Sequence, residues 1–460
     1  MPDISKPPTR IEIAMSLIRT RIEKAPGAKL PSIRRLAEQQ GFSKSTIVEA
    51  YDRLVAEGEV DVKAGSGFFA SARLRPFKLA ESSVQSNRAI DPLWITRHSL
   101  SVRDSSLIPG CGWLPDDWLP GDVMRRILRA VARGETANVT AYGTPQGFPP
   151  LRDQLARRLN ERDVAAEPNS ILLTDSATRA IDLVCRFFLR AGDTVLVDDP
   201  CYFNFQSMMQ AQRVEMVGIP YTQNGPDLEA FAAACIEHRP KLYLTTAVLH
   251  NPTGMNISVS TAHRLLKLAE AHDLIMVEDS VYADLEENAS PGLAALDGLD
   301  RVVLIGSFSK TLSGALRSGF VVAKNDYIEG LTDLALATGF GVSDLPAQIT
   351  HRLLVDGSYR HHLEGLRPRL ARHMGTTIDH LRKLGCTPWH RPESGMFVWI
   401  QLPEDLDSSE IAQRALEHSL VLAPGNVFSV SRNASRYLRF NVAQCGDKRV
   451  FDVLAKVMRA

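Results

Sequence analysis

The stretch GSFSKTLSGALRSGF, residues 306–320, places two serines, a lysine and an arginine directly after an apolar run that reads as a strand. Ser307, Ser309, Lys310 and Arg317 fall within eleven positions of one another. A lysine beside two hydroxyls is typical of a solvated loop, and a short Ser-Lys motif alone carries a high false-positive risk. The alternative interpretation is an amine held for covalent chemistry beside an anion-binding group. The rest of the sequence distinguishes between the two.

Short apolar runs alternate with helical stretches, such as 177–191 and 258–272, from about residue 100 onward. This alternation predicts a largely parallel sheet with helices on both faces. In such sheets ligands bind beyond the carboxyl ends of the strands. The runs that we interpret as buried strands are 170–174, 193–199, 214–220, 241–248, 274–279, 301–307 and 319–323.

Polar side chains follow several of these strands at the points where they end. Taken singly, each has an ordinary explanation: Asp279 is typical of a loop cap, Asn251 of a turn, and Arg317 of a solvated surface. Their occurrence at the ends of four strands of one sheet predicts a polar site at one edge. The residues at the strand ends are Asp175, Ser176, Asn251, Asp279, Ser309 and Lys310.

Pyridoxal 5′-phosphate (PLP) has a use for each of these groups. Lys310 supplies the amine for a Schiff base. Asp279 keeps the ring nitrogen protonated. Asn251 or Tyr282 contacts the phenolate oxygen, and Tyr202 is the candidate for stacking on the ring. The phosphate needs a helix N-terminus, hydroxyls and a cation; the candidates are Ser176, Ala177, Thr178, Ser307, Ser309 and Arg317.

Residues 108–445 resemble the class I/II aminotransferases, which have fold type I of the PLP-dependent enzymes. This resemblance implies an α/β domain with a largely parallel sheet and a smaller C-terminal α+β subdomain. The motifs that carry it are YGTPQGFPPLR (142–152), DDPCY (198–202), HNPTG (250–254), VEDSVY (277–282), SFSKTLSGALRSG (307–319), SGMFVWI (394–400), APGNVF (423–428) and LRFNVA (438–443).

The resemblance also implies roles for individual residues. Lys310 forms the internal aldimine, Arg317 binds the phosphate, Asp279 pairs with the pyridinium, and Asn251 contacts the phenolate with help from Tyr282. Two further roles come from the resemblance alone: Arg439 clamps the substrate carboxylate, and Tyr142 reaches the phosphate of the neighbouring subunit in a homodimer. The chain departs from the family at Ser176 and Thr178, where Gly and Gln are common.

The first seventy residues predict three helices followed by a short hairpin. Ser32 is the expected N-cap of the second helix, Gly41 makes the turn into the third helix (43–58), and residues 64–67 form the hairpin tip. This order favours a winged helix-turn-helix, whose third helix enters the major groove of double-stranded DNA. A small helical packing domain with solvated charges fits the pattern equally. The candidate DNA contacts are Lys44, Ser45 and Thr46, with Arg34 and Lys63 meeting phosphates.

KLPSIRRLAEQQGFSKSTIVEAYDRLVAEGEVDVKAGSGFFA, residues 29–70, resembles the DNA-binding domain of the GntR family of bacterial transcription regulators. The resemblance implies that Gly65 and Gly67 form the wing tip. Val48 departs from the family, because many members have a basic, DNA-facing residue there. The operator preference therefore does not carry over.

Composition bounds the remaining possibilities. The 460 residues have a net charge of zero, but residues 1–75 contain 13 basic and 9 acidic residues, which is compatible with nucleic-acid binding. We expect no membrane span, no secretory signal, no metal site, and a cytoplasmic protein with free thiols. The expected organisation is a winged helix-turn-helix at 1–72, a linker at 73–100 and an aminotransferase-like domain at 101–460.

This combination resembles the MocR subfamily of GntR-type regulators. The leading hypothesis is therefore a homodimeric, PLP-dependent DNA-binding transcription regulator that senses an amino acid, an amine or PLP itself through aldimine chemistry. A catalytically active aminotransferase that carries a DNA-binding domain is the alternative, because Lys310, Asp279 and Arg439 are all present. A structural dimer without cofactor would leave Lys310, Asp279 and Arg317 unexplained.

Overall fold

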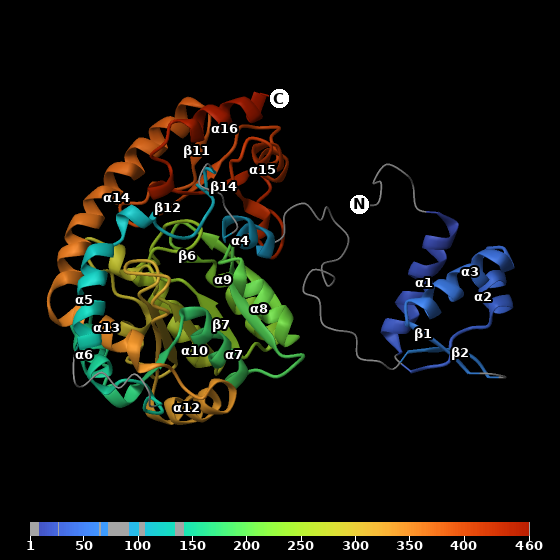
Figure 1. Ribbon diagram of the computed structural model, residues 1–460, viewed down its shortest axis with the longest axis horizontal. Coiled ribbons are helices and arrows are strands. Elements are labelled where there is room, and N and C mark those ends of the chain that lie inside the picture. The colour runs from blue at the N-terminus through green and yellow to red at the C-terminus, as the bar shows by residue number, and fades with distance from the viewer. Residues whose placement is uncertain are drawn as a thin grey trace. The chain divides into compact units, whose positions relative to one another are not determined.

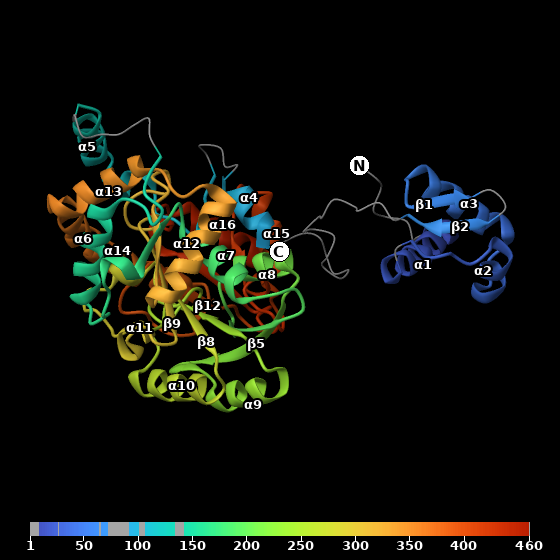
Figure 2. The same cartoon turned by 90° about the horizontal axis from the view of Figure 1, so that it is seen from below.

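The computed structural model describes residues 9–25, 27–63, 66–71, 92–100, 106–133 and 142–459. The chain divides into two compact units, Met1–Lys78 and Leu79–Ala460. Both units are drawn in Figures 1 and 2. Within the described ranges no helix has the length and apolar character of a membrane span, and no three His, Cys, Asp or Glu side chains gather as metal ligands would.

The described residues of the N-terminal unit form three helices and a two-stranded hairpin, in the order predicted from the sequence. Ser32 and Ser43 cap the second and third helices by accepting hydrogen bonds from the amides of Arg35 and Thr46, and Gly41 turns the chain between them with a φ of +67°. The predicted cap at Ser32 is thus confirmed. The elements are α1 (Arg10–Lys24), α2 (Ile33–Gln40), α3 (Lys44–Ala56), β1 (Val60–Lys63) and β2 (Gly67–Ala70), with β1 antiparallel to β2.

The core of this unit is the inner face of α3. Tyr51 is fully buried, its hydroxyl donates to the carbonyl of Pro31 over 2.6 Å, and its ring stacks on Phe68 at 4.1 Å. This hydrogen bond satisfies the phenol in a place that water does not reach. The residues of α3 that face inward, Ile47, Ala50, Tyr51 and Leu54, are all fully buried.

The second unit is built on an eight-stranded sheet in the order β3-β10-β9-β8-β7-β4-β5-β6. Strands β5, β4, β7, β8 and β9 run parallel, whereas β10 lies antiparallel between β9 and β3. All seven predicted strands are present, and the sheet is largely parallel as expected. The bounds are β3 (Ile171–Thr174), β4 (Thr194–Asp199), β5 (Glu215–Thr222), β6 (Gly225–Pro226), β7 (Leu242–Thr245), β8 (Ile275–Asp279), β9 (Val302–Ser307) and β10 (Gly319–Val322).

Helices cover both faces of this sheet (Figure 2), and each face has its own apolar cluster. Successive residues of β8 show the division, because Met276 packs in one cluster and Val277 in the other. The helices of this region are α5 (Gly121–Arg133), α6 (Pro149–Asn160), α7 (Ala177–Phe188), α8 (Asn204–Gln212), α9 (Leu228–His238), α10 (Val259–Ala271), α11 (Leu293–Asp297), α12 (Asn325–Gly339) and α13 (Asp344–Val355).

A smaller antiparallel sheet, in the order β11-β12-β14-β13, forms the C-terminal part with two helices, as the α+β expectation required. The long helix α14 (Ser358–Lys383) runs along the edge of the unit from the large sheet to the small one (Figure 1). The other elements are β11 (Thr387–Pro388), β12 (Phe397–Gln401), α15 (Ser408–Leu416), β13 (Ala423–Pro424), β14 (Tyr437–Asn441) and α16 (Arg449–Arg459).

The segment expected to be a linker, 73–100, ends in a helix. Residues 73–91 lie outside the described ranges, and Pro92–Leu100 form α4. Ile95 of α4 is buried in an apolar cluster with Phe203 and Trp399. Residues 92–100 therefore pack as part of the second unit.

Six cysteines, all in the second unit, are free and buried. Burial raises the pKa of the Cys111 and Cys235 thiols to about 11 and that of Cys185 to about 12. Since the thiolate is the reactive form of cysteine, these side chains behave as apolar core residues.

Candidate functional site

Two of the strand ends that the sequence singled out, those of β3 and β9, meet at the first residue of β10. Gly319 pairs with Thr174 at the end of β3 on one side and with Ser307 at the end of β9 on the other. A Cβ atom at Gly319 would lie 2.6 Å from the carbonyl carbon of Ser176 and 2.9 Å from the amide nitrogen of Ala177. Glycine at this position therefore lets the N-terminus of α7 lie directly against the sheet, beside the serine-rich segment.

An anion-binding arrangement results at this point. Ser176 caps α7 by accepting from the amide of Arg179 over 3.0 Å, so the amides of Ala177 and Thr178 remain at the open end of a twelve-residue helix. Across Gly319, Ser307 Oγ lies 2.9 Å from Ser309 Oγ and 2.8 Å from the carbonyl oxygen of Ser318. Helix amides and hydroxyls so placed suit a phosphate.

Arg317 provides a cation on the same segment. Its backbone has a φ of +49°, the left-handed conformation that non-glycine residues rarely adopt. Its side chain is exposed, and within the described ranges it forms no hydrogen bond or ion pair. A guanidinium without a protein partner beside free helix amides is available to an anionic ligand.

Lys310 reaches inward from the turn that follows β9. Its Nζ donates to the carbonyl oxygen of Gly112 over 2.7 Å. Withdrawal of the amine from water, followed by the charge of Arg439, lowers the pKa of Lys310 to about 8, against an opposing effect of Asp279. A substantial fraction of the amine is thus neutral near physiological pH, which is the form that attacks a carbonyl carbon.

Asp279, the last residue of β8, is 4% exposed. Burial raises its pKa to about 6, whereas the hydrogen bond from the amide of Val281 and the charge of Lys310 act in the opposite direction. A buried carboxylate is unfavourable in its charged form unless a protonated group lies next to it. A pyridinium N–H is such a partner.

The buried guanidinium of Arg439 connects the small sheet to the region around Asn251. Arg439, on β14 of the small sheet, is 1% exposed and donates to Asn251 Oδ1 over 2.9 Å and to the carbonyl oxygen of Gly110 over 2.7 Å. The guanidinium lies over the rings of Phe397 and Phe428, at 4.2 and 4.8 Å from their centroids. Its Nε has no hydrogen-bond partner among the described residues. The cation thus retains donor capacity for a ligand.

Two tyrosines complete the cluster around Asp279 and Arg439. Tyr282 Oη accepts from Asn251 Nδ2 over 3.3 Å, and burial raises the pKa of Tyr282 far above its ordinary range. Burial also raises the pKa of Tyr202 to about 12, with the charge of Asp279 acting in the same direction. Both phenols are therefore protonated donors at neutral pH.

Tyr142 is not brought into this cluster. It is 83% exposed, and its ring contacts Phe340, which is 71% exposed, at 5.1 Å between centroids. Large aromatic side chains in such a position are typical of a surface that another protein chain covers. A role for Tyr142 within one chain has no support in these contacts.

Sequence reasoning missed the segment that forms the opposite wall of the site. The carbonyl groups of Gly110 and Gly112 accept from Arg439 and Lys310, and a Cβ at Gly110 would lie 2.6 Å from the backbone of Ala423. The available signal was the closely spaced glycine pair in PGCG, which marks a close approach of two backbones.

The candidate DNA contacts lie on the surface of the N-terminal unit. Lys44 and Ser45 are exposed in the first turn of α3, and Thr46 is half-buried, with its hydroxyl 2.7 Å from Ser43 Oγ. Arg34 is exposed and pairs with Glu38 at 3.0 Å, a surface ion pair of the weak kind that a phosphate readily replaces.

The remaining two candidates with a described position lie on the hairpin. Lys63 is exposed and lies 4.7 Å from the centroid of the Phe69 ring, and Gly67 has a φ of +98°. Gly65 lies outside the described residues. The exposed side chain of Val48 confirms that this departure from the GntR pattern is at the surface.

Both parts of the chain match known protein families. Residues 115–457 match the aminotransferase class I and II family, and residues 12–70 match the bacterial regulatory proteins of the gntR family. The HTH-type transcriptional regulator YdcR of Escherichia coli is 30% identical over 437 residues, which cover 92% of each chain. YisV of Bacillus subtilis, also an HTH-type transcriptional regulator, is 26% identical over 92% of this chain and 90% of its own.

Solved structures resemble the second unit. LysN, the alpha-aminoadipate aminotransferase of Thermus thermophilus, complexed with N-(5′-phosphopyridoxyl)-L-leucine, has a TM-score of 0.73 and 26% identity, and the match covers 83% of this chain and 97% of LysN. Kynurenine aminotransferase of Pyrococcus horikoshii has a TM-score of 0.74 and 25% identity over 83% of this chain and 96% of its own.

Proposed function

Because the chain belongs to the aminotransferase class I and II family and begins with a gntR-family winged-helix domain, we propose that it is a PLP-dependent, DNA-binding transcription regulator. The large domain binds the cofactor and recognises an amino acid or amine, and the winged helix binds double-stranded operator DNA. Recognition at the first site changes DNA binding at the second if the ligand binds the two states with different affinity. A protein that binds bacterial operators acts in the cytoplasm.

The residues present fit PLP. The phosphate would be held by the amides of Ala177 and Thr178, the serines at 307 and 309, and the exposed guanidinium of Arg317. Asp279 would retain a proton at the ring nitrogen. Asn251 and Tyr282 would face the phenolate oxygen, and Tyr202 the ring. When bound, PLP supplies an electrophilic carbon for an incoming amine and a ring that withdraws electrons. Lys310 supplies the resident amine, and its lowered pKa keeps part of it neutral.

One observation supports a ligand with a carboxylate. Arg439 is a fully buried cation with an unused Nε donor, beside the amine of Lys310: a Cβ at Gly112 would lie 3.7 Å from Lys310 Nζ and 4.0 Å from a terminal nitrogen of Arg439. A planar guanidinium so placed suits bidentate binding of a carboxylate. An α-amino acid has both groups, with the amine directed to Lys310 and the carboxylate to Arg439.

We further propose that the protein acts as a homodimer. The exposed Tyr142 and Phe340 would be covered by a second copy, and Tyr142 would then reach the partner's phosphate site. Regulators with a winged helix commonly present two copies to two half-sites.

An active aminotransferase remains a second candidate, because a neutral Lys310 beside Asp279 and Arg439 is also what transamination requires. The visible spectrum of the full-length protein with PLP, titrated with a panel of amino acids and amines, separates the two. A regulator shifts the cofactor band and holds it there, and the same ligand changes the affinity for operator DNA. An enzyme converts the cofactor to its aminated form, and an oxo acid restores the original band. Failure of every ligand to change the band or the DNA affinity would refute the sensing role.

A further inference from the structure

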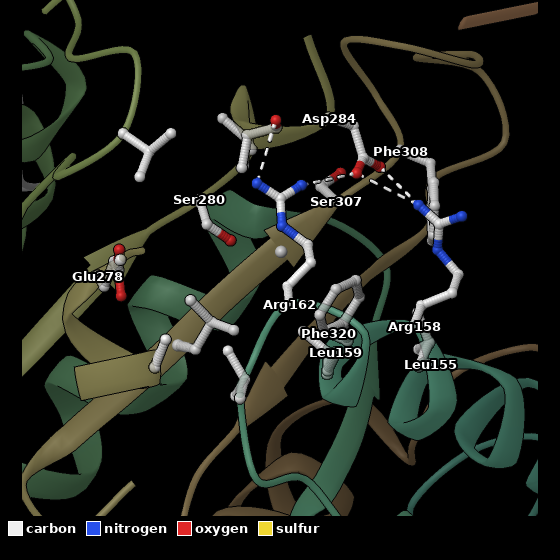
Figure 3. Close-up of a pocket in the computed structure, with 18 of the residues that line it drawn as sticks. Leu155, Arg158, Leu159, Arg162, Glu278, Ser280, Asp284, Ser307, Phe308 and Phe320 are labelled. Carbon is white, nitrogen blue, oxygen red and sulfur yellow. Dashed lines mark hydrogen bonds and ion pairs between the residues drawn. The ribbon is translucent and has the colours of Figure 1, made fainter. Parts of the chain in front are cut away.

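A cavity of about 80 Å³ lies behind β8 and β9, on the face of the sheet opposite to Asp279. Neighbouring residues of a strand point to opposite faces, so Glu278 points into the cavity whereas Asp279 points toward the candidate cofactor site. At about 30 Å³ per water molecule, this volume holds roughly three waters, which corresponds to an organic molecule of a few heavy atoms. Leu159 and Phe320 form part of the apolar wall (Figure 3).

Two arginine and two carboxylate side chains lie at the mouth of the cavity. Arg158 on α6 and Arg162 in the turn that follows α6 both pair with Asp284, at 3.1 and 3.2 Å, and Arg162 also pairs with Glu286 at 3.3 Å. The first three side chains are about a quarter exposed, so the cavity meets solvent here. The two guanidinium groups are thus neutralised by two carboxylates.

Glu278 is the remaining charged group in the wall, and no cation pairs with it among the described residues. It is 1% exposed, and Glu278 Oε2 accepts from the amide of Ala294 over 2.8 Å. Burial raises its pKa to about 7, although the hydrogen bonds from Ala294 and Leu293 and the charge of Arg162 oppose the rise. A carboxylate accepts about four hydrogen bonds, so acceptor capacity remains. Its natural complement is a cation, and the described part of the chain does not supply one in a direct ion pair.

The cavity is also connected to the lysine-bearing segment. Ser307 and Phe308 line it directly. At its mouth, Asp284 Oδ2 accepts from Tyr359 Oη over 2.7 Å, and the same hydroxyl lies 2.7 Å from Thr311 Oγ1, next to Lys310 in the chain. His362 of α14 lies 2.7 Å from the carbonyl oxygen of Thr311 through its Nε2. A molecule in the cavity therefore contacts the residues that fix the turn carrying Lys310.

We propose that this cavity is a second, non-covalent binding site, which takes a small protonated amine with a short apolar body. The ammonium group pairs with Glu278, and the apolar body packs against Leu159 and Phe320. The site differs from the one proposed above in lying on the other face of the sheet and in requiring neither Lys310 nor the cofactor. Its occupancy is transmitted to Lys310 through Ser307 and Phe308.

Trimethylamine is the probe, because its protonated form can pair with Glu278, whereas a tertiary amine cannot form an imine with PLP and so does not compete for Lys310 chemistry. Calorimetric titration of the full-length, PLP-loaded protein should show saturable binding. Glu278→Gln keeps the side-chain size and an oxygen for the Ala294 amide but removes the charge. We expect it to weaken binding by about tenfold to hundredfold, the loss typical of a hydrogen bond to a charged group.

Glu270→Gln is the matched control, since Glu270 has an exposed carboxylate on α10 that pairs with Lys267; it should bind like the wild type. Ala295→Leu fills the cavity without touching the carboxylate and should also weaken binding. The proposal is overturned if the wild type shows no saturable binding, or if either Glu278→Gln or Ala295→Leu, folded as judged by circular dichroism, binds trimethylamine as tightly as Glu270→Gln.

Discussion

Gly319→Ala tests whether the contact between β10 and α7 forms the phosphate site. The φ of Gly319 is not in the left-handed region, so alanine is conformationally acceptable and the cost is purely steric. The new Cβ would approach Ser176 to 2.6 Å, about 0.8 Å closer than the 3.4 Å at which ordinary contact begins. Because the obstructing atoms belong to the backbone of Ser176 and Ala177, the N-terminus of α7 must move as a body.

The magnitude follows from what that end of α7 would bind. A displacement of this size weakens or breaks one hydrogen bond to a phosphate, which contributes about 1.5–3 kcal/mol, so the Kd for PLP should rise by about tenfold to hundredfold. Overpacking at the same place costs about 1–3 kcal/mol of folding stability. Cofactor affinity should thus fall while the protein still folds.

Gly314→Ala provides the matched control on the same segment, because a Cβ there meets no atom within 4 Å. The assay is a titration of apoprotein with PLP, followed by the visible band of the lysine-bound cofactor, with thermal unfolding measured in parallel. If Gly319→Ala and Gly314→Ala bind PLP equally well, the assignment of the α7 N-terminus to the phosphate is wrong.

Three further outcomes are expected. Lys310→Ala should give no visible band with PLP, and in the wild type the rate at which the band appears should rise with pH and level off above about pH 8, because the pKa of Lys310 is lowered to about 8; a rate independent of pH between 6 and 8 would contradict this. The raised pKa of Asp279, about 6 against an ordinary 3.8, means that its ionisation costs the apoprotein up to about 3 kcal/mol of stability as the pH rises from about 4 to 6; Asp279→Asn should remove this part of the loss in denaturant melts, leaving the part due to the raised pKa of Glu278, and should lessen the rise in Tm on adding PLP. Arg439→Gln should weaken amino-acid ligands at least about tenfold while amines without a carboxylate keep their affinity, and an equal effect on both would argue against a carboxylate clamp.

Local patterns predicted the strands and the polar residues at their ends well. Ser32 could be identified as a cap and Asp279 as a strand end because both properties depend on neighbouring residues in the chain. The proximity of Ser176 to Ser307 also followed, since parallel strands end at one edge.

Other parts of the site depend on contacts between distant segments and leave no local pattern. The carbonyl groups of Gly110 and Gly112 receive hydrogen bonds from residues about 200 or more positions later, and any residue supplies a carbonyl. The role of Tyr142 cannot be derived from a single chain, because its proposed partner belongs to another copy. The charge of Glu278 was visible in VEDSVY, but only the alternation of a strand places it on the face opposite to Asp279.

Because every cysteine is buried, labelling by a thiol reagent can report when part of the second unit unfolds. While the second unit is folded, a thiol reagent should find no reactive site, so each labelled cysteine marks a molecule in which part of that unit has come apart. Cys185 lies on α7, so its labelling reports on the helix beside Gly319. Cys386 follows the end of α14 and reports on that region, whereas residues 1–78 contain no cysteine and give no signal. Peptide mapping of the label would thus time the loosening of each region in the presence and absence of ligand, without any introduced probe.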